Sequence, residues 1–174
     1  CMLYRNYKSK NIMICFHGNS EDIFSTEKYG LDFRSYLNMN VLFVEYPGYS
    51  LYMDKDPESE KIFSDSLIVY EWVISTLHFS EAQIFILGRS LGTSPAIYLT
   101  SQKNPKALFL VSAFTSMKDI GESKGVSSFL EEIFNSIKYI GKVKCKVLLI
   151  HGEKDSLIPC QHSEKLCDEV NKLI

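Results

Sequence analysis

Ser90 lies in the pentapeptide GRSLG at residues 88–92, with a glycine two residues before it and a glycine two residues after it. A serine hydroxyl is a weak nucleophile, and it attacks a carbonyl carbon only when it is held where a base can take its proton. A sharp turn between a strand and a helix presents serine in this way, and the crowding of that turn calls for glycine at both flanking positions. The apolar run Ile84–Leu87 predicts a buried strand before the serine, and a helix is expected after it as far as about Ser101. An ordinary glycine-rich turn is the alternative, but this context favours a nucleophile.

Asn19 follows a second apolar run, Ile12–Phe16, which also predicts a buried strand. The carboxyl ends of parallel strands form sites together, so the loop containing Asn19 is expected beside the serine. We predict that the backbone N–H groups of Asn19 and Leu91 form an oxyanion hole for a tetrahedral intermediate. Losing one such donor costs about a hundred- to a thousandfold in rate. The alternative for Asn19 is a helix-capping or loop residue, and the backbone role does not depend on its side chain.

Asp155 follows the predicted strand Val147–Ile150 and comes after Ser90 in the chain. An acid at this place can orient a histidine and stabilise its protonated form, as the acid does in other serine triads. The order serine, acid, histidine is one in which such triads occur. The alternative is a solvated acid in a turn, and the position at a strand end favours the triad.

The histidine of this triad is not evident among the four in the chain: His17, His78, His151 and His162. The first two precede Ser90, and His151 directly follows a strand, where we expect a packing residue. His162 follows Asp155, but we expect it to be a solvated residue of the last helix. The catalytic base is therefore expected beyond Ile174, in a loop after one further strand.

The remaining pattern alternates apolar strands with amphipathic helices. Strands are predicted at 2–7, 12–16, 41–44, 84–87, 107–111 and 147–150, and helices after Ser25, from Asp56-Pro57 to about His78, after the GRSLG turn, over 126–137 and in the last residues. Helix faces expected in the core comprise Tyr29, Phe33 and Leu37 in the first helix and Leu166, Cys167, Val170 and Leu173 in the last. The alternation predicts one α/β domain over residues 1–174, with a mostly parallel sheet and helices on both faces.

Composition narrows the class of protein. The chain has 174 residues, 45% hydrophobic and 23% charged, with a net charge of −2, which predicts no nucleic-acid partner. Its five cysteines are an odd number without a C-x-x-C pair, a pattern typical of a reduced, intracellular protein. No apolar stretch approaches the roughly 18 residues that span a bilayer. The chain begins with Cys1 instead of Met, so we expect it to be part of a longer protein.

Several motifs occur in a fixed order along the chain: 1–4 (CMLY), 16–19 (FHGN), 46–49 (YPGY), 88–93 (GRSLGT), 110–116 (LVSAFTS), 150–155 (IHGEKD), 158–159 (IP) and 162–163 (HS). With these motifs the sequence resembles the α/β-hydrolase-domain serine hydrolases, and in particular their protein-depalmitoylase branch. The resemblance implies an α/β-hydrolase fold, Ser90 as nucleophile, Asp155 as acid, Asn19 and Leu91 as oxyanion donors, and no metal or cofactor. It also implies a catalytic histidine beyond the end of this chain.

The resemblance is incomplete at the amino terminus. Depalmitoylases of this branch have a cluster of acylated cysteines there, whereas this chain has the single Cys1. Membrane attachment therefore does not follow from the resemblance, and any association with a membrane is expected to depend on residues preceding Cys1. The expected location is intracellular, in the cytoplasm or at the cytoplasmic face of a membrane.

The segment between Val111 and Val147 leaves room for a small cap only. Phe114, Met117 and Phe129 are candidates to line an acyl groove, although most of the apolar stripe of 126–137 is expected to be core instead. The sequence predicts hydrolysis of an ester or thioester, with a long-chain S-acylated protein as the favoured substrate. The alternatives are a general carboxylesterase, lipase or serine peptidase of the same fold, and a catalytically silent binding module.

Overall fold

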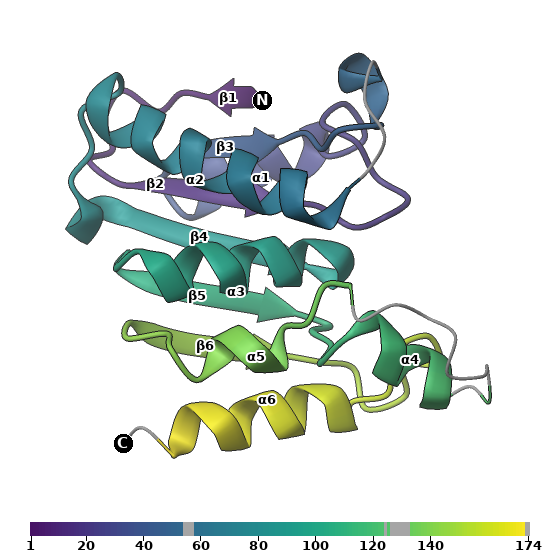
Figure 1. The fold of residues 1–174 in the computed structure, drawn as a ribbon. Coiled ribbons are helices and arrows are strands. Elements are labelled where there is room, and N and C mark those ends of the chain that lie inside the picture. Colours follow the sequence, from purple (N-terminus) through teal and green to yellow (C-terminus); the bar gives the residue numbers. More distant parts are fainter. Residues whose placement is uncertain (54–57, 124, 126–132, 173–174) are drawn as a thin grey trace.

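Six strands form one sheet in the computed structural model, which describes residues 1–53, 58–123, 125 and 133–172 (Figure 1). The strands are β1 (Met2–Tyr4), β2 (Ile12–Phe16), β3 (Asn40–Val44), β4 (Ile84–Arg89), β5 (Ala107–Val111) and β6 (Lys146–Ile150). They are ordered β1-β3-β2-β4-β5-β6, and only β1 runs antiparallel to its neighbour. The mostly parallel sheet expected from the alternating pattern is confirmed, and the first strand ends at Tyr4, short of the predicted Tyr7.

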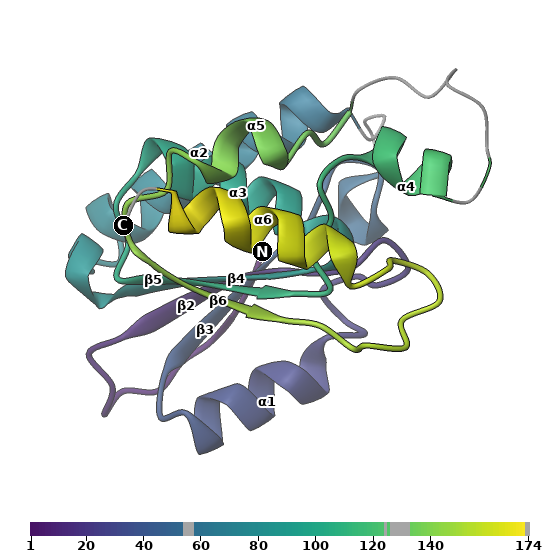
Figure 2. The ribbon, with the colours of Figure 1, turned by 90° about the horizontal axis from the view of Figure 1, so that it is seen from below.

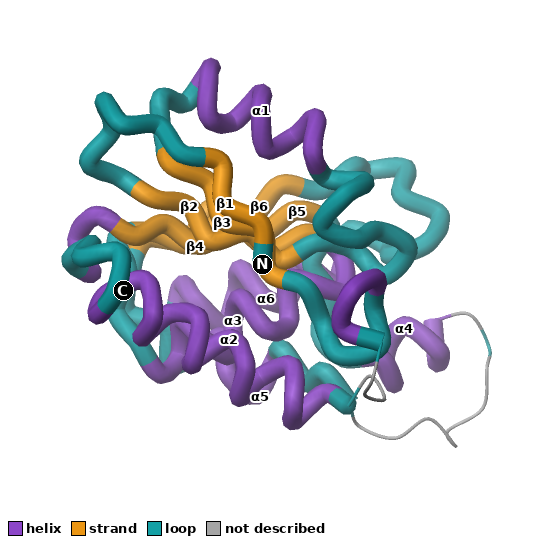
Figure 3. The backbone as a smooth tube through the Cα atoms, turned by 90° about the horizontal axis from the view of Figure 1, so that it is seen from above, coloured by secondary structure: helices purple, strands orange, loops and turns teal. Residues whose placement is uncertain are grey.

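Helices cover both faces of the sheet, as predicted. One face carries α1 (Glu27–Tyr36), and the other carries α2 (Ser59–Ser75), α3 (Thr93–Gln102), α5 (Ile137–Ile140) and α6 (Gln161–Asn171) (Figures 2 and 3). The short helix α4 (Met117–Ser123) lies past the carboxyl ends of the strands (Figure 1). Three 3₁₀ turns complete the described elements: Ser50–Tyr52, Glu81–Gln83 and Ser90–Gly92. No helix in the described ranges is both long and apolar enough to cross a membrane.

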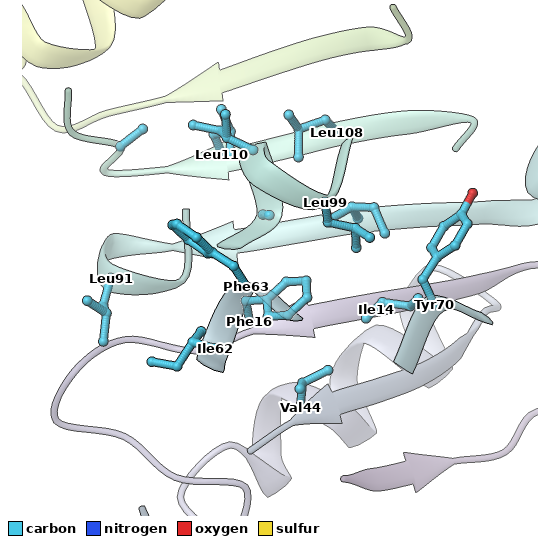
Figure 4. Close-up of a cluster of buried hydrophobic side chains, with 14 of the residues drawn as sticks. Ile14, Phe16, Val44, Ile62, Phe63, Tyr70, Leu91, Leu99, Leu108 and Leu110 are labelled. Carbon is cyan, nitrogen blue, oxygen red and sulfur yellow. The ribbon is translucent and has the colours of Figure 1, made fainter. Parts of the chain in front are cut away.

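The larger of two apolar clusters fills the space between the sheet and α2 and α3 (Figure 4). Side chains alternate across the sheet, so Ile14 and Phe16 of β2 enter this cluster whereas Met13 and Cys15 enter the smaller one beneath α1. All five residues of β2 are buried, because this strand lies in the middle of the sheet and has helices on both sides. The carboxyl end of β2 is therefore a fixed support for the loop that follows it.

The face of β6 turned away from α6 is only half covered. Leu148 and Ile150 are each 50% exposed, and the two residues share one face of an edge strand. The only helix in the described ranges on this side, α1, packs against β3 and β1 at the opposite part of the sheet.

Helix α1 buries a different stripe from the one that the sequence predicted. Tyr29 and Leu37 were expected in the core, but they are about half exposed, and Gly30 is the helix residue that is buried. The ring of Tyr4 lies against this glycine, where a Cβ would be 2.3 Å from the ring edge. This close contact turns the helix so that only Phe33 of the predicted stripe packs on the core.

The start of α1 also differs from the prediction. Ser25 does not cap it; its hydroxyl instead accepts the Asp22 N–H and donates to the Asp22 carbonyl oxygen, with heavy-atom distances of 2.8 and 2.9 Å. The residue before the helix is Thr26.

Two other helix predictions need correction. Residues 133–136 are not helical, because Phe134 has a φ of 52°, in the left-handed region, and α5 begins only at Ile137. The remainder of the predicted 126–137 helix, and the predicted Asp56-Pro57 start of α2, lie outside the described residues. Helix α4 was not predicted. In α6, Leu166 is buried as expected, Cys167 and Val170 are half-buried, and Leu173 lies outside the described residues.

Candidate active site

The turn from β4 into α3 holds Ser90 with a φ of 50°, in the left-handed region that serine rarely adopts. A Cβ on Gly88 would lie 2.5 Å from the Gly92 carbonyl oxygen, and a Cβ on Gly92 would lie 2.2 Å from the Phe16 carbonyl oxygen. Both distances are far below contact, and both neighbours are backbone atoms that cannot rotate away. The turn therefore requires glycine two residues before and two residues after the serine. The reason is the steric crowding that we predicted from the sequence.

Ser90 opens onto a cavity of about 370 Å³ at the carboxyl ends of the strands. Asn19 and Leu91 line the same cavity, so the structure brings three of the four predicted site residues together. The other walls are mainly apolar, and they include Phe114 and Met117, two of the three residues predicted to line an acyl groove. The third, Phe129, lies outside the described residues. Further apolar walls come from Ile62, Ile120, Ile133, Phe134, Leu157 and Ile158.

The N–H groups of Asn19 and Leu91 have no acceptor within the described part of the chain. That of Leu91 is in the first turn after β4, where a helical N–H has no partner of its own. The side chain of Asn19 is also held, because its amide oxygen accepts a hydrogen bond from the Tyr49 hydroxyl at 2.5 Å. Two unused donors thus border the cavity beside the serine.

A buried polar network supports the loop that contains Asn19. The His17 side chain is 0% exposed, and its Nε2 lies 2.9 Å from Oε1 of Glu45, while its Nδ1 lies 2.9 Å from the Gly18 carbonyl oxygen. The Tyr46 ring packs against this imidazole at a tilt, with the ring centroids 4.3 Å apart, and its hydroxyl donates to the His17 carbonyl oxygen at 2.8 Å. Burial holds the pKa of Tyr46 well above its usual value, so the phenol remains a donor.

This network was not predicted from the sequence. The one sequence feature that indicates it is the placement of His17 directly after β2 and of Glu45 directly after β3, the neighbouring strand. Polar residues at the carboxyl ends of two paired strands are expected to lie together, and that rule identifies the pair.

Asp155 lies in the turn after β6, and one carboxylate oxygen accepts the N–H groups of Leu157 and Ile158, each at 2.9 Å. The bond from Ile158, followed by that from Leu157, holds the carboxyl pKa below its usual value although partial burial opposes the shift. Asp155 itself does not line the Ser90 cavity, but the two residues that it binds do. The acid is therefore placed in the turn that forms one wall of the cavity.

The His151 side chain is only 6% exposed at the base of the turn that contains Asp155, which confirms the prediction of a packing residue. Its Nδ1 lies 2.6 Å from the Ser163 hydroxyl, and its Nε2 lies 2.8 Å from the Ile158 carbonyl oxygen and 3.7 Å from the Asp155 carboxylate. The imidazole thereby ties the end of β6 to helix α6.

His162 is buried, and the expectation that it is solvated was wrong. It is 5% exposed, because it is four residues from the fully buried Leu166 and the two share one face of α6. Its Nδ1 lies 2.8 Å from the Thr115 hydroxyl oxygen, and the hydrogen of that hydroxyl is donated to Asp119 of α4. Burial lowers the pKa of His162, and Lys165 lowers it further, while Asp119 raises it.

None of the four histidines, all of which are in the described ranges, lines the Ser90 cavity. His162 borders a different pocket, together with Asp119 and Lys165. A catalytic histidine beyond Ile174 therefore stays a prediction.

The chain is similar in sequence to several known proteins. No protein-family model matches the chain. It is 30% identical over 165 residues to alpha/beta hydrolase domain-containing protein aho-3 of Caenorhabditis elegans, covering 93% of this chain and 49% of that protein. It is 32% identical over 162 residues to protein bem46 of Schizosaccharomyces pombe, covering 87% and 54%. Human alpha/beta hydrolase domain-containing protein 17C is 28% identical over 163 residues, covering 93% and 49%. The chain thus spans about half the length of these curated relatives.

Solved structures show the same fold at lower identity. A puromycin-hydrolysing peptidase of Mycobacterium tuberculosis superposes with a TM-score of 0.75 at 18% identity, covering 93% of this chain and 28% of that one. An acetyl xylan esterase of Paenibacillus sp. R4 superposes with a TM-score of 0.74 at 14% identity, covering 91% and 64%. Together with the parallel sheet and the strained serine turn, these likenesses show that the chain has the α/β-hydrolase fold, and its curated relatives include proteins named alpha/beta hydrolase domain-containing proteins.

Proposed function

We propose that the protein is a serine hydrolase that cleaves esters or thioesters, with Ser90 as its nucleophile and a long-chain S-acylated protein as its favoured substrate. The observation that carries this proposal is the position of Ser90, held in a left-handed turn at the mouth of an apolar cavity beside two unused N–H groups. Strain of this kind costs on the order of 1–3 kcal/mol and is found mainly at functional sites.

The proposed reaction has two halves. The Ser90 oxygen attacks the acyl carbon while the histidine expected beyond Ile174 takes the hydroxyl proton. The N–H groups of Asn19 and Leu91 bind the oxygen that becomes negative, and the positive end of α3 adds to their field. The intermediate then collapses to an acyl-serine, and the histidine returns its proton to the departing thiol or alcohol. Water attacks the acyl-serine in the same manner and releases the acid.

In this proposal Asp155 orients the histidine. Its position supports the role, because the bonds from Leu157 and Ile158 fix the carboxylate in the turn that forms one wall of the cavity, and the lowered pKa keeps the carboxylate ionised at neutral pH.

The cavity walls support the proposed substrate class. Phe114, Met117, Ile120 and Leu157 offer an acyl chain apolar contacts, and each buried methylene contributes about 0.8 kcal/mol. A polypeptide substrate would need backbone partners along its length, which these side chains do not provide. The resemblance to the protein-depalmitoylase branch further favours a thioester on a protein. The five cysteines are all free thiols, and with this substrate we place the protein inside the cell.

Covalent labelling tests the enzyme class. The full-length protein should react with a fluorophosphonate probe, and the Ser90→Ala variant should not. Equal labelling of both, or labelling of neither, contradicts the proposal and favours a binding module.

Substrate comparison tests the finer proposal. The protein should turn over a palmitoyl thioester with a higher kcat/KM than a short p-nitrophenyl ester. The opposite preference would make it a general carboxylesterase, and release of an amine from peptide substrates would make it a peptidase.

A further inference from the structure

The loop between β2 and α1 is linked to the serine turn by one carboxylate, that of Glu21. The Glu21 N–H donates to the Gly18 carbonyl oxygen at 3.2 Å, which closes a tight turn with Asn19 at its corner. The Glu21 side chain then folds back, and its Oε2 accepts the Gly18 N–H at 2.7 Å. Its other oxygen pairs with the guanidinium of Arg89, the residue directly before Ser90.

This link joins the two segments that supply the oxyanion donors. Asn19 lies in the loop after β2, whereas Leu91 lies in the turn after β4. The distance between their N–H groups is therefore not fixed by covalent bonds within one short segment. Glu21 binds the first segment through Gly18 and the second through Arg89. Space is short at this point, since a Cβ on Gly18 would lie 3.1 Å from the Glu21 carboxylate and 3.5 Å from the Arg89 guanidinium.

The pair is too exposed to be important for folding. The Glu21 side chain is 17% exposed and that of Arg89 is 51% exposed, and ion pairs with such access to water contribute little to stability. Oxyanion stabilisation, in contrast, depends steeply on the position of each donor. Loss of the pair is therefore expected to affect the reaction more than the fold.

We propose that Glu21 and Arg89 are positioning residues, which hold the Asn19 loop against the Ser90 turn and set the width of the oxyanion hole. This inference rests on the proposed serine hydrolase function, and it adds to that function two charged residues that do not touch the substrate.

The test measures ester turnover by the full-length protein and by three variants. Glu21→Gln keeps an acceptor for the Gly18 N–H and removes the ion pair, and Arg89→Met removes the charge and keeps the length of the side chain. Each should lower kcat at least about tenfold, short of the hundred- to thousandfold loss for a missing donor, with KM within about twofold. Arg89→Lys should recover part of the lost rate, since it restores the charge without the planar fork.

The double variant separates positioning from independent effects. Either change opens the same link, so Glu21→Gln with Arg89→Met should be no slower than the slower single variant. Lys103→Met is the matched control, because it removes an exposed ion pair with Glu71 that joins α3 to α2 on the surface. It should leave kcat unchanged and shift Tm as little as the Glu21 and Arg89 variants do.

The outcomes distinguish the two proposals. Wild-type kcat in both single variants, multiplicative losses in the double variant, or losses that follow a fall in Tm would overturn the positioning role while the hydrolase proposal remains. Absence of any Ser90-dependent turnover in the wild-type protein would overturn both.

Discussion

Gly92 passes so close to Phe16 that a Cβ on the glycine would lie 2.2 Å from the Phe16 carbonyl oxygen. The serine turn is thus seated on the last residue of the central strand β2. Because β2 is buried along its whole length, the contact leaves the turn no room to shift.

Gly92→Ala should therefore lower the free energy of unfolding by about 1–3 kcal/mol, the usual cost of forcing extra atoms into a packed region. Gly141→Ala is the matched control, because Gly141 has a φ of −66° and no atom of the described residues lies within 4 Å of its Cβ position. Urea denaturation of the full-length protein measures both. Equal stability of the two variants would contradict the steric argument for the serine turn.

Ser90→Gly and Ser90→Ala should both abolish turnover, but they should differ in stability. Alanine keeps the strain of a φ of 50°, whereas glycine adopts this angle freely, so Ser90→Gly should be the more stable variant by roughly 1 kcal/mol. Denaturation midpoints at matched m-values give the comparison. If Ser90→Ala proves as stable as Ser90→Gly, the turn does not store strain.

Leu157→Asp should raise KM for a long-chain acyl substrate about tenfold. The bound acyl chain would cover the leucine side chain, and full burial of a leucine contributes about 1.5–3 kcal/mol. Leu157 is 62% exposed and lines the Ser90 cavity, so the change should leave both Tm and turnover of an acetyl ester as they are. Leu51→Asp, at an exposed leucine outside this cavity, serves as the control. A KM that is unchanged for every chain length would place the acyl chain elsewhere.

The buried His162 makes stability depend on pH. Its folded pKa lies below its ordinary value of 6.5, so the unfolded chain binds the proton more readily. The stability that the neutral imidazole contributes is complete above about pH 6.5 and is lost as pH falls through that value toward the folded pKa. Asp119 opposes the shift, whereas Lys165 and His151 add to it.

His162→Gln keeps a side chain that can hydrogen-bond to Thr115 and does not titrate, so its unfolding free energy should fall less than that of the wild type between pH 7.5 and 5. Urea denaturation at several pH values in this range gives the slopes. Parallel slopes for the two proteins would show that His162 is not responsible.

Much of the sheet and of the serine turn could be predicted, since both depend on local chemistry. Apolar runs bounded by turn residues gave β2 and β5 with their observed bounds, Ile12–Phe16 and Ala107–Val111. The glycines around Ser90 are required by contacts within a few residues and with one strand end.

The failures arose where a distant contact decides the structure. Tyr29 was expected inside because nothing near it in the sequence shows that the ring of Tyr4 lies against Gly30. The left-handed angle of Phe134 interrupts an otherwise helical pattern, and no glycine or asparagine at that position signals it. The burial of His162 could have been predicted, because Leu166 lies one helical turn further on and shares its face of the helix. The prediction placed His162 on the opposite, solvated face.

The two ends of the Ser90 cavity come from different parts of the chain. Ser90, Asn19 and Leu91 are attached to the central strands β2 and β4, while the opposite walls come from α4, from residues 133–134 and from the turn after β6. If the proposed function holds, exchange of residues such as Met117 or Ile120 would alter which acyl chains are accepted without displacing Ser90 or the two N–H donors. A lineage with this architecture could then diversify its substrates while inheriting the same chemistry.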